Sequence, residues 1–350
     1  MTRPEVPDAI RKIADARSAA RRAHNWAEAD RLKAQLEDAG WKVADAASLY
    51  ILERVVAPDE VEDGLTRYGA SASVPSRLDE PPTGSATIVA IATDWPEDLA
   101  RLVHAVLAHA GDGLQVVVVA NAPSSGQAAA LSLLPASVEV VWLARRLGHA
   151  AALNAGIRRA AAPVVIIVDS SIEPAGDLPG ALAAALEDPT VAVAGPFGIV
   201  SSDLRHFTEA PEGQDDVDVI EGYALAFRRA DFIARGPFDE HFEFYRNLDV
   251  WWSLGLRDYG EDDPEDARPR RALRVTTVPI LRHAHRGAAG LTEAARDKMA
   301  KRNFYRVLKI FATRRDLLVN AGDLAANEGE NNQDAEDNQD AEDAGAQDEA

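Results

Sequence analysis

The sequence predicts an α/β domain built on a mostly parallel, doubly wound sheet with helices on both faces. Between residues 86 and 194, short apolar runs rich in Val, Ile and Ala alternate with longer Ala- and Leu-rich segments. Apolar runs of this kind indicate strands that are buried on both sides, and their alternation with helices is typical of parallel sheets. A hydrophobic content of 47% is enough for the core of such a domain.

The expected elements follow from these runs. A sheet of this class binds its ligand at the carboxyl ends of its strands, so the residues that follow each strand are candidates for a site. Strands are expected at 86–92, 115–120, 138–143, 164–168 and 191–194, a further strand-like run at 275–281, and helices at 96–110, 147–161, 250–259 and 295–313.

The first fifty residues are expected to form a helical hairpin. Asn25 can cap the second helix, Glu28 follows three residues later as in a capping box, and Gly40 ends the helix. The apolar stripe of this helix consists of Trp26, Ala29, Leu32 and Leu36.

Four regions are expected along the chain. The hairpin covers residues 1–50, and a linker covers 51–85, where the periodicity ends and Pro, Gly, Ser and Asp accumulate. The main domain covers residues 86–318. The remaining residues, 319–350, are expected to be a disordered tail, because residues 321–350 contain eleven Asp or Glu and no Lys or Arg.

Composition excludes several classes of function. The net charge of -20 argues against nucleic acid as the main partner, since polyanion binding depends on Lys and Arg. The chain has no Cys, which excludes disulfides, Cys-ligated metal centres and thiol catalysis. It has neither an apolar run long enough to span a membrane nor an apolar signal-peptide centre in its first thirty residues. We therefore expect a cytoplasmic protein with no membrane span.

Two common nucleotide-binding motifs are absent. No Gly-x-Gly-x-x-Gly follows the first expected strand, and no Gly-Lys-Ser/Thr phosphate loop occurs. By contrast, Asp169 closes the fourth expected strand at the sheet edge. Its carboxylate there could hold Mg²⁺ or Mn²⁺ beside a diphosphate, or it could simply cap a tight turn. The residues alone leave both interpretations open.

Five segments in a fixed order resemble family 2 glycosyltransferases over about 230 residues. A Thr-Asp segment ends the first strand, and Asn121 lies in the segment that ends the second. The other three segments are Gly148–Ile157, Asp169-Ser170-Ser171 with Gly222–Arg229, and Gly236–Phe242.

The resemblance implies a GT-A fold, that is, a Rossmann-like sheet flanked by helices. It also implies a nucleotide diphosphate-sugar donor and a divalent cation, Mn or Mg. The acceptor would be a polysaccharide, glycolipid or glycoprotein. Carried over by position, the resemblance places Thr93, Asp94 and Asn121 near the nucleoside, Asn154 near the donor sugar or phosphate, and Asp169 with Ser171 at the metal. His283 and His285 would complete the metal site, and Arg282 and Arg286 would bind phosphate.

This chain departs from the family at three positions. Ala120 and Ser171 stand where the family often has Asp, and Asn247 stands where it has an acid that can deprotonate the acceptor. An amide cannot act as a general base. Asp249 is the remaining candidate for the catalytic base, although it equally suits a role in fixing the N-terminus of the following helix.

The N-terminal hairpin resembles the C-terminal helical region of cysteinyl-tRNA synthetases. Aminoacylation is excluded, because the chain has no counterpart of the synthetase active site. The Arg residues of the hairpin are balanced by nearby acids, so we do not expect tRNA as a partner.

Three hypotheses about function remain. The first is a glycosyltransferase that moves the sugar to a hydroxyl acceptor in a single displacement with inversion. The second is a catalytically inactive GT-A-like module that binds nucleotide-sugar or serves as a scaffold, which the three departures favour. The third is an RNA-associated adaptor that acts through the N-terminal hairpin.

Overall fold

The computed structural model describes residues 6, 8–39, 41–46, 49–54, 57–258 and 269–320. The chain divides into two compact units, Met1–Ser73 and Val74–Ala350. Apart from residues 319 and 320, the expected disordered tail lies outside the described residues. None of the helices in the described ranges is long and apolar enough to cross a membrane.

The N-terminal unit contains the two expected helices and two strands that immediately follow them. The helices are α1 (Asp8–Arg22) and α2 (Trp26–Asp38), and α2 begins as expected, with the Asn25 side chain accepting a hydrogen bond from the Glu28 N–H at 3.3 Å. The small core combines Ile10, Ala14, Leu36, Trp41 and Val43. Trp26 does not belong to it, because its side chain is 52% exposed.

The hairpin unit extends beyond residue 50, where the sequence placed its end. Strands β1 (Trp41–Ala46) and β2 (Leu49–Arg54) pair in antiparallel register. Trp41 and Val43, two alternate residues of β1, belong to the core. This alternation is too short to predict a strand from the sequence. The expected linker contains further structure: β3 (Glu60–Glu62), β4 (Leu65–Arg67) and the 3-10 turn η1 (Ser71–Ser73).

Three arginines of the hairpin are engaged with acids inside the same unit. Arg17 is buried and makes a two-pronged ion pair with Asp45, at 2.7 and 3.0 Å. Arg21 also approaches Asp45, at 3.4 Å, and Arg31 pairs with Glu28. These contacts engage three of the Arg side chains inside the unit, so they do not favour the adaptor hypothesis.

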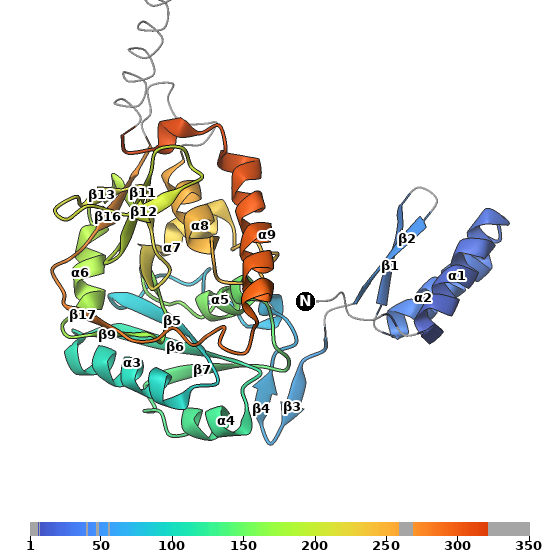
Figure 1. Cartoon of the computed structure of the whole chain (residues 1–350). Helices are drawn as coiled ribbons and strands as arrows, with labels where there is room; N and C mark the ends of the chain where they lie inside the picture. Colours follow the sequence, from blue (N-terminus) through green and yellow to red (C-terminus); the bar gives the residue numbers. More distant parts are fainter. Residues whose placement is uncertain are drawn as a thin grey trace, which may run out of the picture. The chain divides into compact units, whose positions relative to one another are not determined.

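The larger unit is built on the expected, mostly parallel sheet of eight strands (Figure 1). Strands β5 (Ala86–Ala92), β7 (Val138–Leu143) and β8 (Val164–Val168) have the predicted bounds, and β6 (Leu114–Asn121) and β10 (Val191–Gly195) agree to within a residue or so. The order is β13-β16-β10-β15-β8-β5-β6-β7, with β13 (Asp216–Val217) and β15 (Ala224–Arg228) antiparallel to their neighbours.

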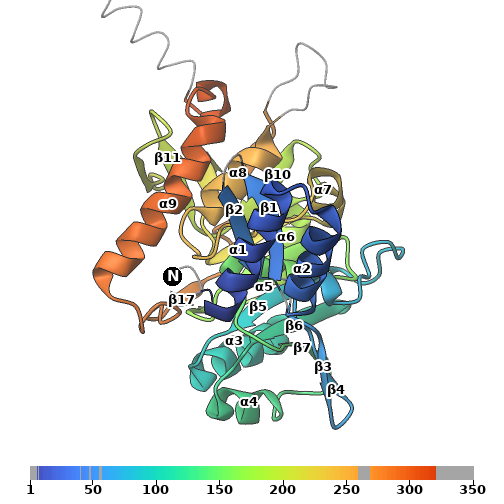
Figure 2. The ribbon, with the colours of Figure 1, turned by 90° about the vertical axis from the view of Figure 1, so that its right-hand side faces the viewer.

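Helices cover both faces of this sheet. The helices α3 (Pro96–His109), α4 (Ser125–Leu131) and α6 (Leu178–Ala185) pack with the even-numbered residues of β5 and β6 in one apolar core. The helix α5 (His149–Ile157) packs on the opposite face, as both views show (Figures 1 and 2). It is shorter than the predicted helix at 147–161. The remaining elements are β9 (Ile172–Pro174), β11 (Gly198–Ser201), β12 (Phe207–Glu209), β14 (Val219–Ile220), α7 (Arg229–Arg235), α8 (Leu248–Arg257), β16 (Arg271–Arg274), β17 (Ile280–Arg282), α9 (Glu293–Phe311) and the 3-10 turn η2 (Arg315–Leu317).

Close packing fixes α5 and α8 beside the carboxyl ends of the strands. Gly156 lets α5 approach the sheet, because an added Cβ would lie 2.5 Å from a methyl carbon of Val89 and 2.7 Å from one of Val119. On the same side, Phe227 packs against Phe238 and against Trp252 of α8, with ring centroids 6.2 and 5.3 Å away. The segments that carry the site are therefore anchored to a rigid core.

Candidate functional site

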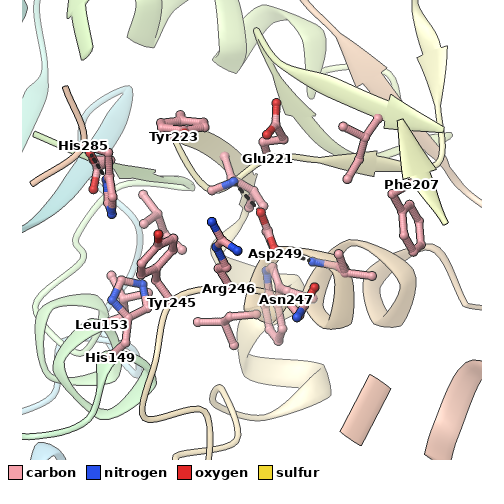
Figure 3. Close-up of a pocket in the computed structure, with 18 of the residues that line it drawn as sticks. His149, Leu153, Phe207, Glu221, Tyr223, Tyr245, Arg246, Asn247, Asp249 and His285 are labelled. Atoms are coloured by element: carbon pink, nitrogen blue, oxygen red, sulfur yellow. Dashed lines mark hydrogen bonds and ion pairs between the residues drawn. The ribbon is translucent and has the colours of Figure 1, made fainter. Parts of the chain in front are cut away.

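A cavity of about 570 Å³ lies where β8 ends and β15 begins (Figure 3). Asp169, the residue after β8, lines one end of it together with His285. Glu221 and Asp249 line its middle, and Phe207 lies toward the other end. The cavity therefore combines the carboxyl end of a parallel strand with the N-terminal end of α8, the kind of location in which α/β proteins bind ligands.

Asp169 and His285 are in direct contact. The Nδ1 atom of His285 lies 3.1 Å from Oδ1 of Asp169, and the Ser171 N–H donates to the same oxygen at 2.8 Å. Burial alone would raise the pKa of Asp169, but the hydrogen bonds from His285 and Ser171 outweigh it and hold this pKa below the usual value. Asp169 therefore carries its negative charge at neutral pH.

Three polar atoms near this pair are buried without a hydrogen-bond partner among the described residues: Thr93 Oγ1, Ser171 Oγ and His285 Nε2. They belong to one region, because Ser171 and His285 both contact Asp169, and Gly287 lies between His285 and Thr93. An added Cβ there would be 3.4 Å from His285 Nε2 and 3.7 Å from a Thr93 methyl carbon. Buried polar groups normally find partners, so a cluster of unsatisfied ones indicates a place for a polar ligand.

The pair fits a divalent cation that is shared with an anionic ligand. Asp169 Oδ1 and His285 Nδ1 lie 3.1 Å apart, a separation that two neighbouring ligands of one cation can have, whereas His285 Nε2 lies on the far side of the ring. Mn²⁺ and Mg²⁺ accept oxygen ligands, and imidazole suits the transition metals. Within the described ranges, no group of three or more His, Asp or Glu side chains could hold a metal, so further ligands would have to come from the bound molecule.

His283 does not join this pair, contrary to the expectation from the sequence. Its Nε2 atom lies 2.8 Å from a Glu173 carboxylate oxygen. Two residues that are two positions apart project from the same side only within a continuous strand. Strand β17 ends at Arg282, before either of them, and the expected strand at 275–281 is present only from residue 280. The period-2 geometry therefore does not apply to His283 and His285.

Asp249 is held by backbone N–H groups on both carboxylate oxygens. Oδ2 accepts from Gly222 and Oδ1 from Val250, each at 2.9 Å. Burial raises the pKa of Asp249, and these backbone hydrogen bonds oppose that effect. The contacts tie the N-terminus of α8 to the turn before β15, so the helix-fixing role left open by the sequence is present in the structure.

Glu221 is a second acid in the cavity, and sequence reasoning missed it. Burial raises the pKa of Glu221, and the nearby negative charge of Asp249 raises it further, while the cation of Arg282 lowers it. Glu221 directly precedes the Gly222–Arg229 segment of the family resemblance, and this adjacency was the only available signal. A carboxylate with a raised pKa in a cavity is a candidate for proton transfer.

The family departures have structural explanations. Ala120 is fully buried within β6, where no charge could be placed without a partner. Asn247 adopts a left-handed backbone conformation with φ of 68°, which Asn tolerates better than most residues. Its side-chain amide donates to the Ala300 carbonyl of α9 at 3.1 Å. Asn247 therefore shapes the entry to α8 and joins it to α9.

Two of the expected donor-binding amides are used inside the fold. Asn121 both donates to the carbonyl and accepts from the N–H of Leu147, at 3.0 and 2.8 Å. Asn154 is only 3% exposed and pairs in the same way with Phe238, at 2.9 and 3.0 Å. Because both ends of each amide are occupied, these contacts favour a structural role over the expected contact with the donor.

Arg286 and Asp94, which were expected to contact the nucleotide, both form ion pairs within the fold. Arg286 binds Glu97 at 3.0 Å and Asp98 at 2.7 Å, so its charge is already compensated. Asp94 accepts hydrogen bonds from the Ser124 N–H and from Arg146. Partial burial opposes them, but these bonds lower the pKa of Asp94. Its side chain remains 41% exposed, so Asp94 can still meet a ligand at the rim.

Arg282 remains available to an anion. Its guanidinium lies 4.3 Å from the ring centroid of Tyr223 and 4.8 Å from that of Phe197. No ion pair of Arg282 at salt-bridge distance is found among the described residues, although its charge lowers the pKa of Glu221. Stacking on two rings fixes its position without neutralising its charge. Of the two arginines predicted to bind phosphate, Arg282 is therefore the one that lines the cavity.

Aromatic rings and a second imidazole complete the wall near Asp169. The Tyr245 ring lies 4.5 Å from that of His285 and 6.3 Å from that of His149, and Tyr223 lies 6.2 Å from His285 (Figure 3). Burial lowers the pKa of His149 to about 4, which the charge of Asp169 only partly offsets. His149 is therefore neutral at pH 7. Sequence reasoning singled out none of His149, Tyr223 and Tyr245 as a site residue, since packing in the core explains such residues equally well.

The comparison with protein families gives one match in this unit. Residues 87–243 match the model of the family described as "Glycosyl transferase family 2". This range includes all strands from β5 to β15 and the residues Asp169 and Glu221, and it ends before Asp249 and His285. A search of curated proteins finds no sequence that matches the chain.

Solved structures share the fold. The chain is similar to the crystal structure of GalNAc-T7 with UDP, GalNAc and Mn²⁺, with a TM-score of 0.52 and 15% identity over 73% of this chain and 52% of that chain. It thus spans about half the length of that protein. Two others are the mannosyltransferase PcManGT from Pyrobaculum calidifontis with GDP-Man and Mn²⁺ (TM-score 0.45, 18% identity, 73% and 78% covered) and S. aureus TarS (0.44, 13%, 66% and 44%). The likeness to GalNAc-T7 confirms the expected GT-A fold.

Proposed function

We propose that this chain, which carries a glycosyl transferase family 2 domain over residues 87–243, moves a sugar from a nucleoside diphosphate-sugar donor to a hydroxyl group of an acceptor. The contact between Asp169 and His285 at the edge of the cavity is the observation that carries the proposal. It supports a donor site at the end of β8, where the unsatisfied polar atoms of Thr93 and Ser171 also gather. A polysaccharide, glycolipid or glycoprotein acceptor remains our expectation from the resemblance.

The donor half of the cavity has the groups that a diphosphate needs. Asp169 and His285 would hold a divalent cation, which when bound would offset the charge of the diphosphate leaving group. Arg282, stacked on Tyr223, supplies a fixed cation that also lines the cavity. The buried hydroxyl of Ser171 can donate to a phosphate oxygen, which suits a position where the family usually has a second carboxylate.

The acceptor half lies around Glu221 and Asp249. Tyr223 and Tyr245 line the cavity on the side of His285, and aromatic faces are suited to packing against sugar rings. A carboxylate here can take the proton of an acceptor hydroxyl as its oxygen attacks the anomeric carbon from the side opposite the diphosphate. We expect a single displacement with inversion, because the cavity offers a base on the acceptor side.

The experiment is a donor screen. Purified full-length protein is incubated with a panel of UDP-, GDP- and dTDP-sugars, with and without Mn²⁺, and release of nucleoside diphosphate is followed alongside binding by calorimetry. We expect one donor to bind and to be consumed slowly, with water as the acceptor. Binding without consumption would favour the inactive nucleotide-sugar-binding module, and absence of binding to every donor would contradict the proposal.

A further inference from the structure

Two carboxylates lie in the acceptor half of the cavity, but their bonding differs. Both oxygens of Asp249 accept backbone N–H groups, from Gly222 and from Val250. Within the described residues, no donor bonds to the carboxylate of Glu221, although the residue lines the cavity. Glu221 and Asp249 are also linked through the backbone, because the residue after Glu221 is the Gly222 that donates to Asp249.

A general base needs a lone pair that can reach the proton it removes. The lone pairs of Asp249 already receive hydrogen bonds that fix the N-terminus of α8, and such bonds to the charged form make a carboxylate a weaker base. Glu221 has no such bond and keeps its lone pairs for a substrate. Resting on the function proposed above, we infer that Glu221 is the catalytic base and that Asp249 is a positioning residue that holds the turn carrying Glu221.

The proposed step balances as a single displacement. The acceptor hydroxyl gives its proton to a carboxylate oxygen of Glu221 while its oxygen forms a bond to the anomeric carbon. The bond from that carbon to the diphosphate oxygen breaks, and the nucleoside diphosphate leaves with the electron pair. The proton on Glu221 then passes to solvent, and the carboxylate is restored.

The groups that face Glu221 determine how its activity depends on pH. Burial and the negative charges of Asp249 on α8 and Glu209 on β12 raise the pKa of Glu221, while Arg282 on β17 lowers it. The deprotonated form is the active one. Turnover is therefore expected to fall as the pH drops through the raised pKa of Glu221, and this acid limb should disappear when Glu221 cannot titrate.

The test compares Glu221→Gln, Asp249→Asn and the control Glu187→Gln in the full chain. Glu187 is exposed after α6 and does not line the cavity, so its substitution removes one carboxylate without touching the proposed site. The donor that the wild type consumes is used, and release of nucleoside diphosphate to water is measured across pH. Calorimetry reports donor affinity, and thermal unfolding confirms that each variant is folded.

We expect Glu221→Gln to lower kcat by about 10²–10⁴-fold with donor Kd unchanged, and to abolish the acid limb of the pH profile. Asp249→Asn should keep that limb and lose mainly thermal stability, and Glu187→Gln should retain near wild-type kcat. A folded Glu221→Gln variant with kcat within about twofold of wild type, or loss of the limb in Asp249→Asn alone, would overturn the assignment while leaving the transferase proposal intact. Failure of the wild type to consume any donor would instead contradict both.

Discussion

Individual residues around the cavity are tuned by burial and by their nearest charges. Asp169 stays ionised because His285 and Ser171 donate to it, whereas Asp249 and Glu221 have raised pKa values because burial outweighs their partners. The cavity therefore combines one acid that is ionised at neutral pH with two acids of raised pKa. Under the proposed transfer, Asp169 would face the donor and Glu221 would accept the proton of the acceptor.

His149 should make stability depend on pH. Its pKa falls from 6.5 to about 4 in the folded protein, so between these values the unfolded chain binds more protons than the folded one. Stability should therefore rise with pH across this window, with a slope of up to about 1.4 kcal/mol per pH unit from this residue. Denaturant titrations of wild type and His149→Gln at several pH values test this. Equal slopes in the two proteins would show that His149 is not buried in its neutral form.

Asp249 is expected to contribute mainly to stability. Asp249→Ala would remove the acceptor of two N–H groups, those of Gly222 and Val250. Leaving such donors unsatisfied should lower the free energy of unfolding by about 1–3 kcal/mol. Urea denaturation at neutral pH measures the change. A variant as stable as the wild type would mean that water replaces the lost carboxylate without cost.

At the scale of elements, close packing positions α5 over the sheet. Gly156→Ala would place a methyl group within 2.7 Å of Val89 and Val119 side-chain atoms, which are short and branched and cannot swing away. We expect this change to lower the free energy of unfolding by about 1–3 kcal/mol, although Ala favours helix over Gly. Denaturant unfolding checks this value.

Gly126→Ala in α4 is the matched control for that prediction. No atom lies within 4 Å of the position of an added Cβ at Gly126, so the substitution should be neutral or stabilising by up to about 1 kcal/mol. If Gly156→Ala behaves like Gly126→Ala, α5 does not contact the sheet as closely as described.

In the N-terminal unit, the ion pair between Arg17 and Asp45 joins α1 to β1. Arg17 is 4% exposed but the Asp45 side chain is 42% exposed, so solvent weakens the pair and Arg17→Ala should cost about 1–2 kcal/mol. Hydrogen exchange of α1 amides in the full chain measures this locally. Arg22→Ala, an exposed position on the same helix, should leave exchange unchanged. Equal exchange in both variants would contradict a stabilising role for the pair.

The Arg17 hydrogen bond lowers the pKa of Asp45, which sets the pH dependence of this contact. A carboxylate with a lowered folded-state pKa stabilises the fold above its unfolded pKa, and that contribution is lost as the pH falls through the folded pKa. Protection of α1 should therefore weaken in acid in the wild type more than in Asp45→Asn.

The elements that were predictable from sequence are those whose signal is local. Strands β5, β7 and β8 are continuous apolar runs with abrupt ends, and they appear with the predicted bounds. The direction of β15 could not be read from its sequence, because Ala224-Leu225-Ala226-Phe227 packs equally well in a parallel or an antiparallel strand. The pairing of β1 with β2 was missed because each strand is short and only one face is buried.

The site was less predictable, because its side chains find partners far along the chain. Asp169 and His285 are separated by 116 positions, and the structure brings their side chains into contact, while their role at a metal stays a prediction. Asn154 bonds to a residue 84 positions away, and that partner, which occupies its amide, leaves no local mark in the sequence. Glu221 was overlooked because the absence of a hydrogen-bond donor to its carboxylate can be seen only in the structure.

At the scale of the whole chain, a unit whose residues 87–243 match the glycosyl transferase family 2 model occurs with a small α/β hairpin unit that has its own core. The β12-β11-β14 sheet contributes Ile199, Phe207 and Glu209 to the cavity, and β17 contributes Arg282. Under the proposed function, these segments would border the acceptor, and differences among acceptors are expected to depend on them.

The most direct measurement is calorimetric titration of the donor found in the screen, with and without Mn²⁺, into wild type, Asp169→Ala, His285→Ala and His283→Ala. We predict that Mn²⁺ strengthens donor binding to wild type and to His283→Ala. In Asp169→Ala and His285→Ala this enhancement should fall by roughly tenfold or more. An unchanged Mn²⁺ effect in Asp169→Ala and His285→Ala would contradict the donor site at the end of β8.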